Sequence, residues 1–144
     1  MAGKQRFDDL PPPARLFESM RAHGYTLGSA IADLIDNSIA ADSRNVWVKF
    51  HWEEEASWIA VTDDGTGMTE DMLKAAMSLQ SRSPYDTREP KDLGRFGLGL
   101  KTASFSKARR LTVITRPEQG GPFLRRWDLD YIAEHPSKVW PCLW

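Results

Sequence analysis

Apolar residues in the first third of the chain recur at intervals of three and four, which is the spacing of one helix face. Residues 14–24, "ARLFESMRAHG", predict a short helix that ends at Gly24, and Thr26 is the expected N-cap of a second helix over 27–41. One stripe of the second helix is expected to pack: Leu27, Ile31, Leu34, Ile35 and Ser38. Its opposite side carries Asp33, Asp36, Asn37 and Ala40.

Strict alternation of apolar and polar residues then replaces the helical spacing. "NVWVKFH" shows this alternation and predicts a half-buried strand, "EEEAS" is the expected hairpin connection, and "WIAVTDD" is the expected returning strand. Thr69 is the expected cap of a third helix, and a fourth begins near Leu98, followed by the strands "RLTVITR" and "FLRRWDLD". This order predicts an α+β fold, a two-layer sandwich with helices on one face of a mixed, mostly antiparallel sheet.

Composition narrows the class of protein. The 144 residues fit one domain over 1–144, and a net charge of -1 gives no overall field that would gather nucleic acid, so direct nucleic-acid binding is not indicated. The single cysteine, Cys142, rules out a disulfide framework or a zinc cluster in this sequence. Neither a signal peptide nor an apolar run of about 18 residues is present, so we expect a cytoplasmic protein that does not enter the membrane.

The polar side of the second helix is the first candidate site. Asp33 and Asn37 are four residues apart and point toward one spot. A carboxylate can take a proton from water, and an amide oxygen can bind Mg²⁺ without adding charge. Taken alone, the same residues fit an ordinary solvated helix face.

Two glycine-rich stretches are the other candidates. In "VTDDGTGMT", Gly65 and Gly67 follow a predicted strand and allow close approach of the backbone, although Asp-Gly also favours a tight turn. In "LGRFGLGLKTAS", glycines precede a predicted helix start, where backbone N–H groups can bind an anion and Lys101 adds positive charge. A flexible loop is the alternative there. The polar, proline-containing stretch 81–92 between them predicts a lid.

In order and spacing, the three stretches together resemble the GHKL superfamily, which comprises gyrase B subunits, ninety-kilodalton heat-shock chaperones, histidine kinases and MutL-type repair proteins. "DLIDN" resembles the family's E-x-x-x-N, while Asp63, Gly65 and Gly67 match D-x-G-x-G. The lid-end pattern G-x-x-G-x-G matches Gly94, Gly97 and Gly99. The resemblance covers about residues 13 to 130, is strongest to the microrchidia-like and chaperone-like branch, and implies the Bergerat fold.

The resemblance also implies roles in binding ATP and Mg²⁺. Asn37 would ligate the metal, Asp63 would accept the adenine amino proton, Asp36 would support the adenine side through water, Gly67 would let the base approach, and Met68 would pack on it. A lid over about 80–98 would close on ATP. The remaining nucleotide-binding residues would be Gly65, Gly94, Phe96, Gly97, Leu98, Gly99, Lys101 and Thr102.

Two departures from the family pattern change the expected function. Where the family usually has a catalytic glutamate, this sequence has Asp33. The aspartate side chain is one methylene shorter, which draws its carboxylate back by about 1.5 Å. A misplacement of that size can lower the reaction rate by on the order of 10²-fold. The family's late Gly-Thr strand motif is also missing, because Thr112 and Thr115 lie too early, so the sequence is expected to be a fragment.

The predicted function is Mg-ATP binding with slow hydrolysis, in which closure of the lid drives formation of a homodimer or docking of a protein partner. The alternative is a weak or inactive nucleotide-regulated interaction module. A histidine-kinase role is disfavoured because His23, His51 and His135 do not lie on a long dimerising helix. The basic run "KARRLTVITR", with Arg125 and Arg126, is explained more simply as a solvated sheet face than as a nucleic-acid site.

Overall fold

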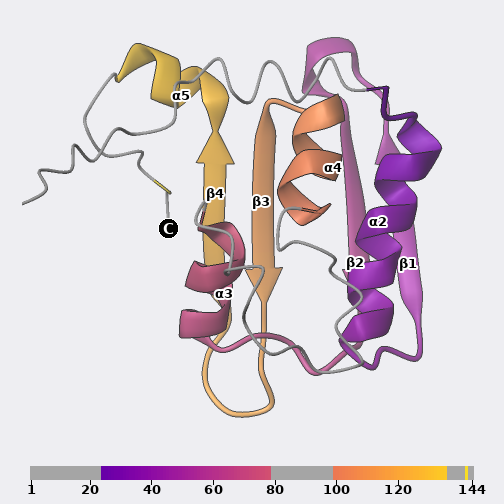
Figure 1. Ribbon diagram of the computed structural model, residues 1–144, viewed down its shortest axis with the longest axis vertical. Coiled ribbons are helices and arrows are strands. Elements are labelled where there is room, and N and C mark those ends of the chain that lie inside the picture. Colours follow the sequence, from indigo (N-terminus) through magenta and orange to yellow (C-terminus); the bar gives the residue numbers. More distant parts are fainter. Residues whose placement is uncertain (1–23, 79–98, 136–141, 143–144) are drawn as a thin grey trace, which may run out of the picture.

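The computed structural model describes residues 24–78, 99–135 and 142, which form helices lying over antiparallel hairpins (Figure 1). The predicted helix at 14–24 and the lid at about 80–98 lie almost entirely outside these residues. The α+β fold class predicted from the sequence is therefore found in the part of the chain that the structure describes.

Helix α2, Leu27–Ala40, begins where the sequence predicts and ends one residue early. Thr26 caps it, and its side-chain oxygen accepts a hydrogen bond from Ser29 N at 3.0 Å. Of the predicted packing stripe, Ser38 is buried and the apolar members are half-buried. One face of the helix therefore packs on the protein and the other faces solvent.

The four strands pair as two hairpins. β1, Val46–His51, pairs with β2, Trp58–Asp63, across the 3-10 helix η1, Glu54–Ala56. β3, Arg110–Thr115, pairs with β4, Phe123–Asp128. Among the described residues these hairpins are separate two-stranded antiparallel sheets, which corrects the prediction of one mixed sheet. The short connections within each hairpin favour antiparallel pairing of its two strands.

A layer of helices lies on one side of the strands in Figure 1. α2 contacts β2, α3 (Glu70–Met77) contacts β4, and α4 (Gly99–Lys107) contacts both α2 and β3. This arrangement agrees with the predicted placement of helices on one face. None of the described helices is long and apolar enough to cross a membrane.

Helix α5, Leu129–Glu134, was not predicted. The sequence "FLRRWDLD" was interpreted as one strand, but Asp128 ends β4 and caps the helix. Its Oδ1 accepts hydrogen bonds from Asp130 N at 3.0 Å and from Tyr131 N at 3.2 Å. An aspartate at an N-cap accepts hydrogen bonds from the first backbone N–H groups of a helix. This capping favours a helix after Asp128 over continuation of the strand.

The core lies between the second hairpin and its helices. Trp127 of β4 is 4% exposed, and its Nε1 donates to the Met77 carbonyl oxygen at 2.9 Å. This bond ties β4 to the end of α3 and satisfies the buried indole. The buried cluster consists of Leu73, Met77, Phe105, Leu111, Trp127, Leu129 and Ile132.

Candidate functional site

Asp63 ends β2 and lies against α2. Ser38 Oγ donates to Asp63 Oδ2 at 2.9 Å, and Gly65 N donates to Asp63 Oδ1 at 2.9 Å. Ser38 is 3% exposed, whereas the Asp63 residue is exposed to solvent. An ionised carboxylate has about four acceptor positions, so two remain for an external donor.

The two glycines of the loop are required by close packing. A Cβ on Gly65 would lie 2.6 Å from the Ala41 carbonyl oxygen, at the end of α2. Gly67 has a φ of +68°, and a Cβ there would lie 2.3 Å from the Arg116 carbonyl oxygen. Both distances are shorter than a non-bonded contact allows. The spacing of the D-x-G-x-G motif therefore lets one loop fit between α2 and the end of β3.

Asp64, the neighbouring carboxylate, has a different role. Its Oδ1 accepts from Arg44 N at 2.7 Å and Asn45 N at 2.9 Å, and its Oδ2 accepts from Asn45 Nδ2 at 2.8 Å. The hydrogen bond from the Asn45 side chain is the main cause that lowers the Asp64 pKa. Asp64 therefore fixes the turn before β1, and Asp63 is the carboxylate that remains available to a ligand.

Thr115 is a residue of this region that sequence reasoning set aside. Met68 N donates to Thr115 Oγ1 at 2.8 Å, and Thr115 is 8% exposed. The threonine was excluded because its strand comes too early to be the late motif, but β3 ends beside the loop. Met68 itself is half-buried and packs against the core cluster.

Asp33 lies on α2, one turn before Asn37, and its side chain is hydrogen-bonded to a residue that precedes the helix. Tyr25 Oη donates to Asp33 Oδ2 at 2.7 Å. This hydrogen bond is the main cause that raises the Tyr25 pKa. Asp33 is half-buried, while Asp36 and Asn37 are exposed. The exposed Asn37 amide is thus accessible to a metal ion.

Lys101 is placed differently from the other predicted site residues. It is 1% exposed, and its Nζ donates to the carbonyl oxygens of Ala76 at 2.7 Å and Ser78 at 2.6 Å. Burial lowers the pKa of this ammonium. In this conformation Lys101 binds the C-terminal end of α3, where the helix dipole favours a cation, and its contact with phosphate stays a prediction.

Gly99 and Thr102, two residues predicted to bind the nucleotide, lie in the first turn of α4. A Cβ on Gly99 would meet nothing within 4 Å, and Thr102 is half-buried. α4 packs beside α2, so its N-terminus belongs to the same layer as Asn37 (Figure 1). The other predicted residues of this stretch, Gly94, Phe96, Gly97 and Leu98, lie outside the described residues.

Two of the predicted site residues have polar groups that a ligand could reach. Asp63 keeps acceptor capacity, and Asn37 is exposed to solvent. The described part of the chain has no cluster of three or more His, Cys, Asp or Glu that could hold a metal by itself. Mg²⁺ characteristically binds through one or two protein ligands together with substrate phosphates, which agrees with a single amide ligand.

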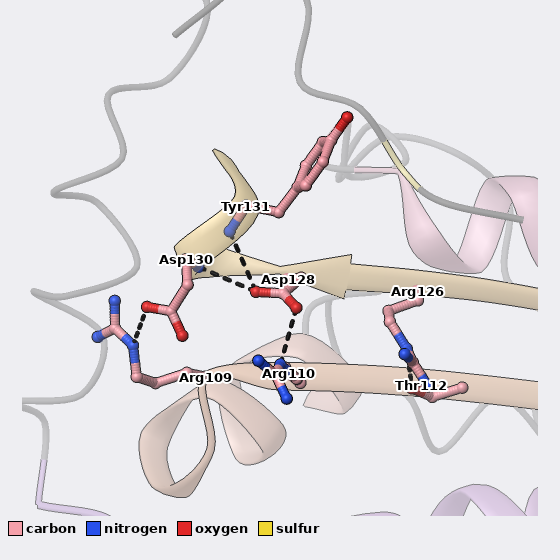
Figure 2. A network of polar contacts seen from close by, with 7 residues as sticks. All are labelled: Arg109, Arg110, Thr112, Arg126, Asp128, Asp130 and Tyr131. Atoms are coloured by element: carbon pink, nitrogen blue, oxygen red, sulfur yellow. Dashed lines mark hydrogen bonds and ion pairs between the residues drawn. The ribbon is translucent and has the colours of Figure 1, made fainter. Parts of the chain in front are cut away.

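Three arginines of the basic cluster on the second hairpin pair with carboxylates. Figure 2 shows Arg109 Nε bonded to Asp130 Oδ1 at 2.7 Å and Arg110 Nε bonded to Asp128 Oδ2 at 2.7 Å. In addition, Arg125 Nη2 contacts Glu70 Oε1 at 2.5 Å. These pairs support the interpretation of the run as a structural sheet face.

Comparisons with known proteins agree with this geometry. The family described as "Histidine kinase-, DNA gyrase B-, and HSP90-like ATPase" matches residues 25–143. ATPase morc-1 of Caenorhabditis elegans is 30% identical over 90 residues, which cover 62% of this chain and 10% of that protein. Chaperone protein HtpG of Bacillus velezensis is 34% identical over 91 residues, which cover 58% of this chain and 14% of that protein.

A repair protein matches over a longer stretch. DNA mismatch repair protein MutL of Halobacterium salinarum is 31% identical over 105 residues, covering 72% of this chain and 16% of that protein. The chain thus spans between 10% and 16% of the length of these three relatives. Because the family match covers most of the sequence, the chain belongs to the histidine kinase-, gyrase B- and HSP90-like ATPase family, the GHKL superfamily that the three motifs predict.

Proposed function

We propose that this chain is a Mg-ATP-binding domain that hydrolyses ATP slowly. The observation that carries the proposal is the Asp63 carboxylate, which Ser38 and the Gly65 amide orient while two of its acceptor positions stay available. An adenine amino group is a donor that such a carboxylate can bind. Membership in a family of ATPases supports the choice of ATP over other ligands with an amino group.

The remaining binding roles follow from the predicted sites. Met68 packs beside the base, Asp36 supports it through water, and Asn37 ligates magnesium, which neutralises phosphate charge when bound. The N-terminus of α4 faces the phosphates and offers backbone N–H groups. The phosphate-binding residues in this proposal are Gly94, Phe96, Gly97, Leu98, Gly99, Lys101 and Thr102.

Hydrolysis in this proposal depends on Asp33. Its carboxylate accepts a proton from the attacking water, as a general base. Because aspartate is shorter than glutamate by about one C–C bond, 1.5 Å, the reacting water is held less well and turnover is slow. Binding does not need the extra methylene and is retained.

The coupling of ATP to work is the part of the proposal that rests on family membership. The lid at about residues 80–98 would close over ATP and drive homodimer formation or docking of a protein partner. The relatives include a chaperone and a mismatch repair protein, which points to action on macromolecules, but the chain spans only 14% and 16% of those proteins.

A second candidate is a nucleotide-regulated interaction module that does not hydrolyse ATP. The short side chain of Asp33 favours it. Titration with ATP and measurement of phosphate release over hours separate the two candidates. Slow release that Asp33→Asn abolishes and Asp33→Glu accelerates supports the ATPase; binding without release supports the module. Failure to bind ATP overturns both.

A further inference from the structure

The hydrogen bond between Tyr25 and Asp33 joins two residues that none of the three motifs connects. Tyr25 lies before the helix cap, and Asp33 lies almost two turns into α2. Their oxygens, Tyr25 Oη and Asp33 Oδ2, are 2.7 Å apart. We propose that Tyr25 is a positioning residue that orients the Asp33 carboxylate for proton transfer, an inference that rests on the proposed ATPase function.

The local backbone explains how Tyr25 reaches Asp33. Thr26 adopts extended angles, φ -76° and ψ 160°, and its side chain accepts from Ser29 N. This cap fixes the direction in which the chain enters α2, and the adjacent Tyr25 therefore leaves the backbone at a defined angle. Both Tyr25 and Asp33 are half-buried, so water competes less with their hydrogen bond than at an open surface.

The charged groups around α2 have other partners. On β2, Asp63 accepts from Ser38 and Gly65, and on α4, Lys101 donates to carbonyl oxygens of α3 while Lys107 is exposed. Asp36 on α2 itself is exposed. Among the described residues, Tyr25 is the one hydrogen-bond partner that the Asp33 side chain has.

The geometry divides the two carboxylate oxygens between two tasks. Oδ2 accepts a hydrogen bond from the phenol, which fixes the orientation of the side chain and leaves Oδ1 to accept a proton from water.

The test compares Tyr25→Phe with Tyr131→Phe, which removes a phenol on α5 away from α2. Tyr25→Phe keeps the ring and is expected to bind Mg-ATP within about 2-fold of the wild type. Its kcat is expected to fall by on the order of 10-fold, because the base loses its fixed orientation. Tyr131→Phe should change neither quantity.

A second measurement does not depend on turnover. Spectrophotometric titration of the phenol should show a Tyr25 pKa above the ordinary value of 10.0, and Asp33→Asn should bring it back toward that value. If Mg-ATP binds and Asp33→Asn abolishes turnover, but Tyr25→Phe keeps the wild-type kcat, the positioning role is overturned and the ATPase stands. If ATP does not bind, or if Asp33→Asn keeps full turnover, the proposed function fails, and the positioning role fails with it.

Discussion

The Ser38 hydroxyl donates to the Asp63 carboxylate at 2.9 Å and joins helix α2 to the end of β2. Ser38→Ala removes this donor from a buried position, so we expect the free energy of unfolding to fall by about 1 kcal/mol, the usual net value of one hydrogen bond. ATP affinity should fall as well, because Asp63 loses one of its two orienting donors. Denaturant unfolding and ATP titration measure the two effects.

The control for this variant is Thr62→Ala, on the exposed residue directly before Asp63. It should leave ATP affinity unchanged. Equal affinity losses in Ser38→Ala and Thr62→Ala would mean that the Ser38 hydroxyl does not orient the binding carboxylate.

Two glycines should respond in opposite directions to alanine. At Gly67 the φ of +68° and the Arg116 carbonyl oxygen at 2.3 Å exclude a Cβ, so Gly67→Ala should lower the free energy of unfolding by roughly 1 to 3 kcal/mol or more. At Gly28, near the start of α2, the nearest atom to a new Cβ would be 3.8 Å away. Gly28→Ala should keep or raise stability, by up to about 1 kcal/mol. Urea unfolding midpoints test both; a stable Gly67→Ala variant would contradict the described loop.

The motifs were predictable from sequence because each is local. Thr26 and Thr69 cap helices where predicted, and all four predicted strands lie close to their observed bounds. The local sequence pattern did not predict α5. The side chain of Asp128 caps a helix at the point where the strand was expected to continue. The family resemblance predicted Asp63 as the adenine-binding carboxylate. The contacts that distinguish it from Asp64 join residues distant in sequence: Ser38 donates to Asp63, whereas Arg44 and Asn45 donate to Asp64.

The placement of Lys101 shows why contacts between residues distant in sequence could not be predicted. A lysine after a glycine-rich turn predicts a phosphate contact, but this ammonium binds carbonyl oxygens 23 and 25 residues away in the chain. Nothing in the spacing of "GLGLKTAS" indicates that α3 ends beside α4. The contact between Met68 N and Thr115 was missed for the same reason, since it joins residues 47 positions apart.

Lys101 should be required for stability, independently of any ligand. Lys101→Met keeps an unbranched apolar stem but leaves the Ala76 and Ser78 carbonyl oxygens without this donor. We expect a loss of about 1 to 3 kcal/mol in the free energy of unfolding, because two hydrogen bonds from a buried charged donor are removed. Lys107→Met, at the exposed end of the same helix, should change stability by less than about 0.5 kcal/mol. Similar values for the two variants would show that the buried contact contributes little.

Asp64 should make stability depend on pH in the acid range. Its folded-state pKa lies below the unfolded value of 3.8, so its contribution is present above that pH and is lost as pH falls through the folded pKa. The stability difference between wild type and Asp64→Asn should therefore be constant near neutral pH and shrink below 3.8. Unfolding curves at several pH values measure it. Asn45→Ala, which removes the strongest donor, should reduce this pH dependence; no reduction would contradict the assigned cause.

The central claim is tested most directly by the magnesium dependence of ATP affinity in wild type and in Asn37→Ala. Asn37 is exposed, so its truncation should leave the fold intact. Isothermal titration with ATP, in Mg²⁺ and in EDTA, should show that Mg²⁺ tightens wild-type binding by on the order of 10-fold, equivalent to about 1.4 kcal/mol. Asn37→Ala should lose that increment and keep its affinity in EDTA. Wild-type protein that does not bind ATP, or a variant that keeps the full magnesium increment, would contradict the account.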